Sequence, residues 1–305
     1  MAARSSRDRR VVTLLPAATE IVAALGGIDT LVGVSHECDY PPAVRGLPRL
    51  TTTPIDAATP APVIDAEVRR LQAEGRPVIA VDGEALRRVA PDLIVTQGLC
   101  EVCAVADGEV HRAARLLDPS PEILSLSAST LAGIALDIRR LGEALDLAAD
   151  AEELVLGLES RLRRLARSPL AGAPRRVLCV EWLDPLYLAG HWMPELIAAA
   201  GGRDVGACPG SHSARRDWRD VVALRPEIVI VALCGFGVER AEYDLHAVVD
   251  PEVLRALSGP EIWLLDGNAY TSRPGPRVVD GAERIRLALE GREAPGLRRW
   301  RRAPV

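Results

Sequence analysis

"LRRVAPDLIVTQG" (86–98) and "VVALRPEIVIVALCG" (221–235) follow one pattern at two places in this 305-residue chain. Each has a helical segment, a proline that breaks it, an acidic residue, an apolar strand and then a glycine. A pair of glycines ends a helical pattern in each half as well: Gly26-Gly27 in the first and Gly201-Gly202 in the second. The repeat indicates that the chain is built from two similar halves.

The first half alternates short apolar runs, such as 11–15 and 93–96, with helical patterns. The second half repeats this alternation, with apolar runs at 176–181, 228–233 and 261–265 and a helical pattern at 245–257. Continuous apolar strands that alternate with helices are typical of a parallel sheet covered on both faces. The pattern therefore predicts an α/β fold with two Rossmann-like lobes.

No strand pattern occurs between the two halves, from about 129 to 166. Leucines and isoleucines recur there at three- and four-residue spacing, which predicts one long amphipathic helix or two in series. We predict an N-terminal lobe at 10–128, a connector helix at 129–168 and a C-terminal lobe at 174–292. Because open α/β sheets bind ligands at the carboxyl ends of their strands, we expect a ligand cleft between the lobes.

Composition excludes several classes of partner. The net charge is −5, all 37 basic residues are arginine, and no basic face is evident, so we expect no nucleic acid. No apolar run approaches 18 residues, so we expect no membrane insertion. The N-terminus has no apolar segment of signal-peptide length. We therefore expect a cytoplasmic protein whose six cysteines are thiols or ligands, not disulfides.

Several spaced blocks resemble one family. "VVTLLPAATEIVAALGGIDTLVGVSHECDYPPAVRGLPRL", "VAPDLIVTQ", "VLCVEWLDPLYLAGHWMPELIAAAGGRDV" and "LRPEIVIVA" occur in this order. Over about residues 10–290 the chain resembles the helical-backbone, cobalamin/iron-siderophore class of substrate-binding proteins of bacterial ABC-type uptake transporters. Its cobalamin-binding members are the most similar. The resemblance implies a small-molecule ligand held between two lobes. Family members also dock onto transporter permeases, but the missing export signal argues against such docking here.

The resemblance places a set of residues at the ligand cleft. In the first lobe these are Pro16 and Ala17, the Ser35–Tyr40 loop and the 97–100 segment that begins at Gln97. In the second lobe they are Trp182, His191, Trp192, Trp218, the Cys234–Phe236 segment and the Asn268–Tyr270 loop. Arg273, which lies just before the last helical pattern, could pair with a ligand carboxylate or amide oxygen, or with Glu37.

Cysteines form an unusual group in the first lobe. Cys100 and Cys103 make a C-x-x-C pair after an apolar strand, and the resemblance brings His36 and Cys38 to the same rim. Three thiolates and an imidazole would suit Zn²⁺ or an iron–sulfur cluster. A redox dithiol, or simply small half-buried residues, are the alternatives for the pair.

Five of the ten aromatic residues fall at predicted strand ends or loops of the second lobe: Trp182, Trp192, Trp218, Phe236 and Tyr270. A flat apolar wall of this kind suits a planar ligand such as a corrin or porphyrin, although packing between the lobes would also use such rings. Tyr40 could stack on the same ligand or pack internally. His191 could ligate the metal of a tetrapyrrole, or make a polar contact at the rim.

These observations lead to three hypotheses. The first is binding of a cobalamin-like corrinoid, or a related tetrapyrrole or metal chelate, in the cleft. The second is a cytoplasmic enzyme or sensor that uses a metal or iron–sulfur cluster on Cys38, Cys100 and Cys103. The third is an interaction module without a ligand. A binding protein is favoured over a catalyst, because no G-x-S-x-G, H-E-x-x-H, Walker A or G-x-G-x-x-G motif occurs.

Overall fold

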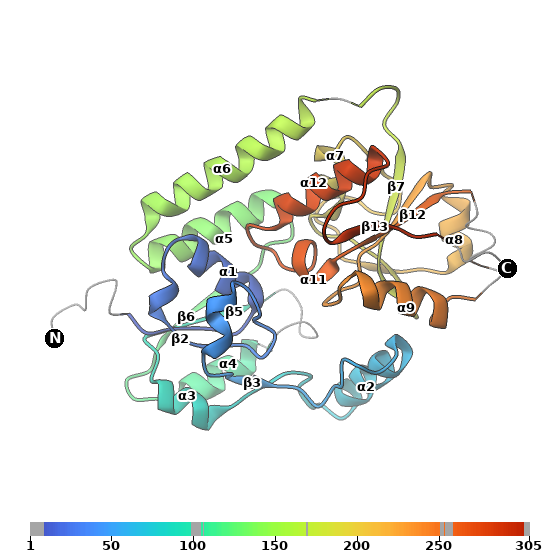
Figure 1. The fold of residues 1–305 in the computed structure, drawn as a ribbon. Coiled ribbons are helices and arrows are strands. Elements are labelled where there is room, and N and C mark those ends of the chain that lie inside the picture. Colours follow the sequence, from blue (N-terminus) through green and yellow to red (C-terminus); the bar gives the residue numbers. More distant parts are fainter. Residues whose placement is uncertain are drawn as a thin grey trace. The chain divides into compact units, whose positions relative to one another are not determined.

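Two sheets, each with helices on both faces, organise the chain (Figure 1). The computed structural model describes residues 9–98, 105, 107–168, 170–250, 253 and 259–301. One compact unit comprises the chain up to Ala57, Ala66–Ala128 and Ala132–Gly157; the other comprises Ala58–Asp65, Ser129–Leu131 and the chain from Leu158 onward. The predicted two-lobed α/β fold is confirmed.

The first unit is built around a four-stranded parallel sheet of order β2-β1-β5-β6. Its strands are β1 (Val11–Thr13), β2 (Leu31–Val34), β5 (Leu93–Gln97) and β6 (Glu122–Leu126). Its helices are α1 (Pro16–Ala24), α3 (Gly83–Val89), α4 (Asp107–Ala114) and α5 (Leu131–Ala144), with 3-10 turns at Ile28–Thr30 and Pro42–Gly46. A small antiparallel ribbon joins β3 (Thr51–Thr52) to β4 (Ala80–Val81).

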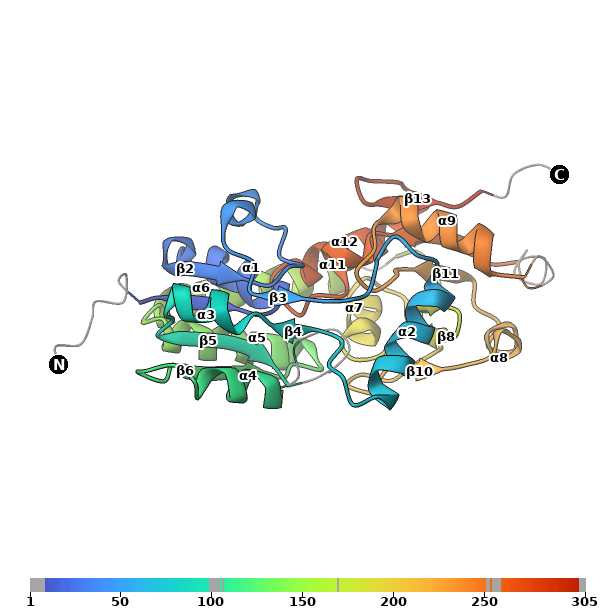
Figure 2. The ribbon, with the colours of Figure 1, turned by 90° about the horizontal axis from the view of Figure 1, so that it is seen from below.

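Helices cover both faces of this sheet. Alternate residues of the strands, such as Val12 and Ile94, pack with Leu86 of α3 and Val110 of α4 in one core cluster. Helices α1 and α5 lie on the opposite face (Figures 1 and 2). Because the central strands β1 and β5 are buried on both sides, polar side chains are confined to the strand ends.

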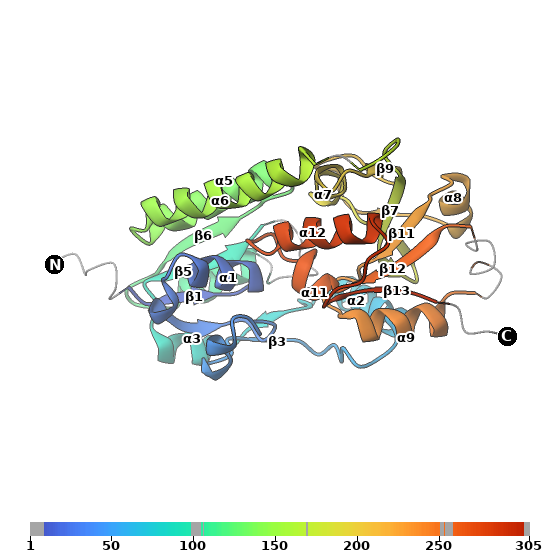
Figure 3. The ribbon, with the colours of Figure 1, turned by 45° about the horizontal axis from the view of Figure 1, so that its top comes forward.

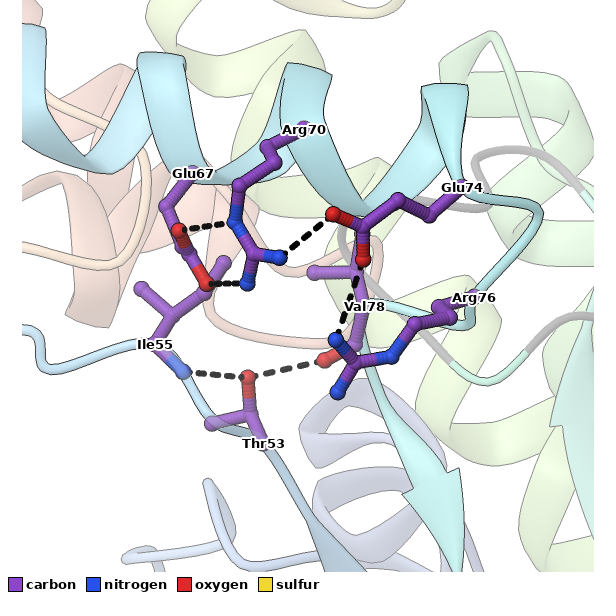
Figure 4. Close-up of polar contacts among 7 residues, drawn as sticks. All are labelled: Thr53, Ile55, Glu67, Arg70, Glu74, Arg76 and Val78. Atoms are coloured by element: carbon purple, nitrogen blue, oxygen red, sulfur yellow. Dashed lines mark hydrogen bonds and ion pairs between the residues drawn. The ribbon is translucent and has the colours of Figure 1, made fainter.

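Helix α2 (Ala61–Ala73) carries an exposed network of charges, shown with the β3–β4 ribbon in Figure 4. Arg70 lies 2.6 Å from a carboxylate oxygen of Glu67 and 2.7 Å from one of Glu74, and Arg76 lies 3.1 Å from Glu74. Exposed pairs of this kind contribute little to stability, whereas each fully buried aliphatic side chain contributes about 1.5–3 kcal/mol. The network is therefore a solvated surface, and burial holds the unit together.

The connector segment forms two helices, which is the second of the two alternatives that the leucine and isoleucine spacing predicted, and not a single connector helix. Helix α5 ends at Ala144 and α6 (Ala148–Ala166) begins four residues later. Asp146 has a φ of 55°, a left-handed conformation that ends a helix, and Asp adopts it more readily than most residues. The two helices lie side by side (Figures 1 and 3).

Gly142 allows this close packing. A Cβ atom at Gly142 would lie 2.4 Å from Ala151 Cβ and 3.1 Å from the Leu147 carbonyl oxygen. The boundary between the two units falls within α6, after Gly157. The residue bounds predicted for the lobes and the connector stay a prediction.

The second unit contains a mixed sheet of order β10-β8-β7-β11-β12-β13, with β9 also paired to β7. Its strands are β7 (Arg176–Leu183), β8 (Leu186–Leu188), β9 (Arg203–Asp204), β10 (Ala214–Arg215), β11 (Ile228–Val231), β12 (Glu261–Leu265) and β13 (Leu297–Arg299). Its helices are α7 (Met193–Ala199), α8 (Trp218–Ala223), α9 (Val238–Val248), α11 (Gly267–Tyr270) and α12 (Val278–Leu289).

Strands β7, β9, β11 and β12 are parallel, as predicted, whereas the short strands β8, β10 and β13 are antiparallel additions. Helices α8 and α9 pack on one face through Val221 and Leu245, and α7 and α12 pack together on the other. Helix α9 begins at Val238, not at 245 as the sequence pattern predicted. In the described part of the chain, no helix has the length and apolar character that a membrane span requires.

We expect Gly142→Ala to destabilise the protein by roughly 1–3 kcal/mol, because the added methyl group would overlap Ala151 across the α5–α6 contact. Gly157→Ala is the matched control, because no atom lies within 4 Å of the Cβ position there. That change should instead stabilise the exposed helix by roughly 0.5–1 kcal/mol. Urea unfolding measures both, and equal stability of the two variants would contradict the packing described.

Candidate functional site

The carboxyl ends of the parallel strands are the candidate site in each unit, because parallel strands place these ends at one edge of a sheet. In the first unit, β1 and β2 end beside a buried chain of hydroxyl and thiol groups. Thr19 Oγ1 lies 2.7 Å from Thr13 Oγ1 and 3.0 Å from Cys38 Sγ. Cys38 is only 1% exposed. Its thiol therefore packs beneath the surface and helps to tie α1 to the loop that follows β2.

The loop after β2 is held by a second set of contacts. His36 Nδ1 lies 2.7 Å from Thr51 Oγ1, and the His36 backbone N–H donates to the same oxygen. Arg49 donates to the backbone carbonyls of Ser35 and Cys38, at 3.1 and 2.6 Å. Burial lowers the pKa of His36, and the positive charge of Arg49 lowers that pKa further. His36 is therefore a neutral imidazole near neutral pH.

The predicted metal set finds no support among the described residues. No three His, Cys, Asp or Glu side chains come together there in a way that could hold a metal ion. His36 contacts Thr51, whereas Cys38 contacts Thr19. Cys100 and Cys103 lie outside the described residues, so the part of the prediction that concerns them stays a prediction.

Two other residues of the first unit were predicted to line the site. Gln97 is the last residue of β5 and is half-buried, paired in register with Leu126 of β6. Tyr40 is 44% exposed and precedes Pro41 through a cis peptide bond. Both lie at or after strand ends, and their predicted role in ligand binding stays a prediction.

In the second unit, Trp182 and Phe236 come together from neighbouring strands. Trp182 lies near the end of β7, and Phe236 follows β11 after a turn at Gly235, which has a φ of 77°. Their ring centroids are 6.0 Å apart and the rings are tilted by 37°. Both side chains are half-buried. This pair forms a two-ring apolar surface at the carboxyl edge of the sheet.

Arg240 supports this pair from α9. Its guanidinium carbon lies 4.5 Å from the centroid of the Phe236 ring, a cation–π contact. Its Nε lies 2.8 Å from the carboxylate of Asp244, a fully buried residue one helical turn further on. The ion pair fixes the position of the guanidinium, and the guanidinium in turn fixes the ring.

The third strand end, after β12, carries Asn268, Tyr270 and Arg273. Arg273 is 6% exposed and donates to Asn268 Oδ1 at 2.7 Å. Arg284 of α12 stacks on Tyr270, with its guanidinium carbon 3.7 Å from the ring centroid, and donates to the Tyr270 hydroxyl at 2.8 Å. Arg273 thus holds Asn268 in place within the loop, and Arg284 holds Tyr270.

Trp192 and Trp218 have different surroundings from Trp182. Trp192 is 5% exposed, and its indole N–H donates to the Thr271 carbonyl at 2.9 Å. Trp218 begins α8 and packs against the core cluster of the unit. Trp192 therefore belongs to the interior. Trp218 is half-buried, as are Trp182 and Phe236, and Phe236 packs against the same core cluster as Trp218.

Most of the chain matches one known protein family. The model of a periplasmic binding protein family matches residues 11–254. The chain belongs to the periplasmic binding protein family. A vitamin B12-binding protein of Vibrio cholerae serotype O1 is 22% identical over 285 residues, which cover 90% of this chain and 87% of that protein. The predicted family is confirmed.

Solved structures of other members share the fold. A periplasmic heme-binding protein from Pseudomonas aeruginosa superposes with a TM-score of 0.73 at 20% identity, covering 97% of this chain and 99% of that one. The periplasmic vitamin B12-binding protein of Vibrio cholerae superposes with a TM-score of 0.64 at 22% identity, covering 92% and 96%. At these identities the likeness establishes the fold and leaves the ligand open.

Three residues of the site were not predicted from the sequence: Arg240, Arg284 and Thr19. The sequence does contain a pattern that could have indicated Arg240. This residue lies four residues after Phe236 and four before Asp244, the spacing of one helical turn. The helix was predicted to begin only at 245, which left Arg240 in a loop. Arg284 and Thr19 reach Tyr270 and Cys38 through the folded structure, and no sequence spacing indicates those contacts.

We expect the thiol of Cys38 to be unreactive in the folded protein, because it is buried, and that of Cys208 to react, because it is exposed. Ellman's reagent measures this. Cys38→Ser should leave the number of fast-reacting thiols at the wild-type value, whereas Cys208→Ser should lower it by one. In denaturant, each variant should have one reactive thiol fewer than wild type. A loss of a fast-reacting thiol in folded Cys38→Ser would contradict the burial of Cys38.

Proposed function

We propose that this protein binds a corrinoid such as cobalamin, or a porphyrin, against the strand ends of its second unit. The observation that carries the proposal is the Trp182–Phe236 pair, two half-buried rings 6.0 Å apart at the carboxyl edge of the sheet. One similar protein is named for binding vitamin B12 and another for binding heme. Both names support a large, flat, metal-centred macrocycle as the ligand.

Physical chemistry favours such a ligand at these rings. A macrocycle offers a broad apolar face, and aromatic pairs contribute about 0.5–1.5 kcal/mol beyond the area that they bury. Phe236 is already in contact with the guanidinium of Arg240, so little rotamer freedom is lost when a ligand binds. Asn268, held by Arg273, presents a polar group near the neighbouring strand end, where the amide or carboxylate arms of a macrocycle would need partners.

The alternative of an enzyme or sensor with a cysteine-bound metal or cluster is not proposed. It required Cys38 as a ligand, and that thiol is buried against Thr19. Family membership favours binding over catalysis, and we extend the proposal to delivery of the ligand to an ABC-type permease, in place of the expectation that no permease docks. This role would require a location outside the cytoplasm. The cytoplasmic location expected from the N-terminus is the opposing prediction, and it stays a prediction.

Titration of the purified protein with cyanocobalamin and, separately, with haemin tests the proposal. We expect saturable 1:1 binding of at least one of them, with a Kd below about 10 μM, followed by absorbance and by quenching of tryptophan fluorescence. The two ligands distinguish a corrinoid protein from a porphyrin protein. Absence of binding of both at about 100 μM would overturn the proposal.

Trp182→Ala should weaken the binding by about tenfold or more, equivalent to about 1.4 kcal/mol, because it removes half of the two-ring surface. Tyr243→Ala is the matched control: Tyr243 is an aromatic residue of α9 that is 60% exposed, and its removal should leave the Kd unchanged. Equal affinities of the two variants would show that the ligand binds elsewhere.

A further inference from the structure

His191 and His212 come together in the second unit, on two segments joined by backbone hydrogen bonds. His191 lies between β8 and α7, and His212 lies in the loop before β10. The His191 N–H donates to the Ser211 carbonyl at 2.6 Å, and the Gly210 N–H donates to the His191 carbonyl at 2.9 Å. Gly190 permits this approach, because a Cβ there would lie 2.3 Å from the Ser211 oxygen. The backbone segments that carry the two histidines are thus held next to each other.

The imidazole of His191 is held in an unusual setting. Its φ is 53°, in the left-handed region that few residues other than glycine adopt. Its Nδ1 is buried and has no hydrogen-bond partner among the described residues. A strained backbone and a buried polar atom without a partner are both uncommon, and both occur preferentially at binding sites. An ion bound at this nitrogen would satisfy it.

The separation of the rings suits two ligands of one metal ion. The ring centroids of His191 and His212 are 5.4 Å apart and the planes are nearly perpendicular, at 88°. Two imidazoles bound to one ion at a metal–nitrogen distance of about 2.1 Å and a tetrahedral angle have centroids roughly 5.2 Å apart. The observed separation therefore needs little adjustment for shared coordination.

The protonation of His191 fits the same role. Burial lowers the pKa of His191, and the nearby charge of His212 lowers that pKa further. A metal ligand must be a neutral imidazole, so little proton release opposes binding near neutral pH.

We propose that His191 and His212 together bind one late divalent transition-metal ion, such as Zn²⁺, Ni²⁺ or Cu²⁺, for which imidazole is a preferred ligand. Among the described residues no third His, Cys, Asp or Glu completes the set, so the remaining positions of the ion would hold water or donor atoms of a small ligand. The inference is independent of the macrocycle proposed above.

Calorimetric titration of untagged, chelator-treated protein with NiCl₂, ZnCl₂ and CuCl₂ tests the inference. We expect binding of one ion per chain for at least one of these salts. His212→Asn should weaken binding at least tenfold, and so should His191→Asn, in which asparagine suits the left-handed backbone. His111→Asn, a change of an exposed histidine on α4 in the first unit, is the matched control and should bind like wild type.

Electron paramagnetic resonance of the Cu²⁺ complex gives a second measurement that does not depend on affinity. The spectrum should show two coordinated imidazole nitrogens in wild type and one in His212→Asn. Because His212 is exposed, this substitution should not disturb folding. No binding at about 100 μM metal would overturn the inference. Unchanged affinity in both site variants, or an equal loss in His111→Asn, would overturn it as well.

Discussion

Burial of the central strands on both faces is the constraint on which the rest of the structure depends. Residues 11–12, 93–95 and 228–231 are almost fully buried, and helices cover both sides of the strands that contain them. Such strands cannot present polar or ligand-binding side chains along their length. The chemistry of each unit is therefore concentrated in the segments that follow the strand ends: the loop at 35–40, Trp182, the turn at 234–236 and the short helix at 267–270.

The two units use these strand ends differently. The first unit places buried hydroxyl and thiol groups there, and their hydrogen bonds fix the loop that contains His36 and Cys38. The second unit places aromatic rings there, and arginines contact two of them: Arg240 contacts Phe236, and Arg284 contacts Tyr270. Cys38 is thus a packing residue, and we propose that the ligand binds against the aromatic rings of the second unit.

Much of the fold could be predicted because its signals are local. The Pro91 and Pro226 positions mark the starts of β5 and β11, and the apolar runs that follow are those strands. The turn at Asp146 could not be predicted in the same way, because α5 and α6 both bury an apolar face, so leucine spacing continues across the reversal. The strands β8, β10 and β13 have two or three residues each and exist through pairing with neighbours. Burial of Cys38 and Trp192 likewise depends on tertiary packing, which spacing along the chain does not reveal.

A crystal structure of the protein grown with cyanocobalamin or haemin tests the central claim most directly. The account predicts a macrocycle whose flat face lies against Trp182 and Phe236, with its polar arms near Asn268. A macrocycle bound away from the carboxyl ends of β7, β11 and β12 would contradict it.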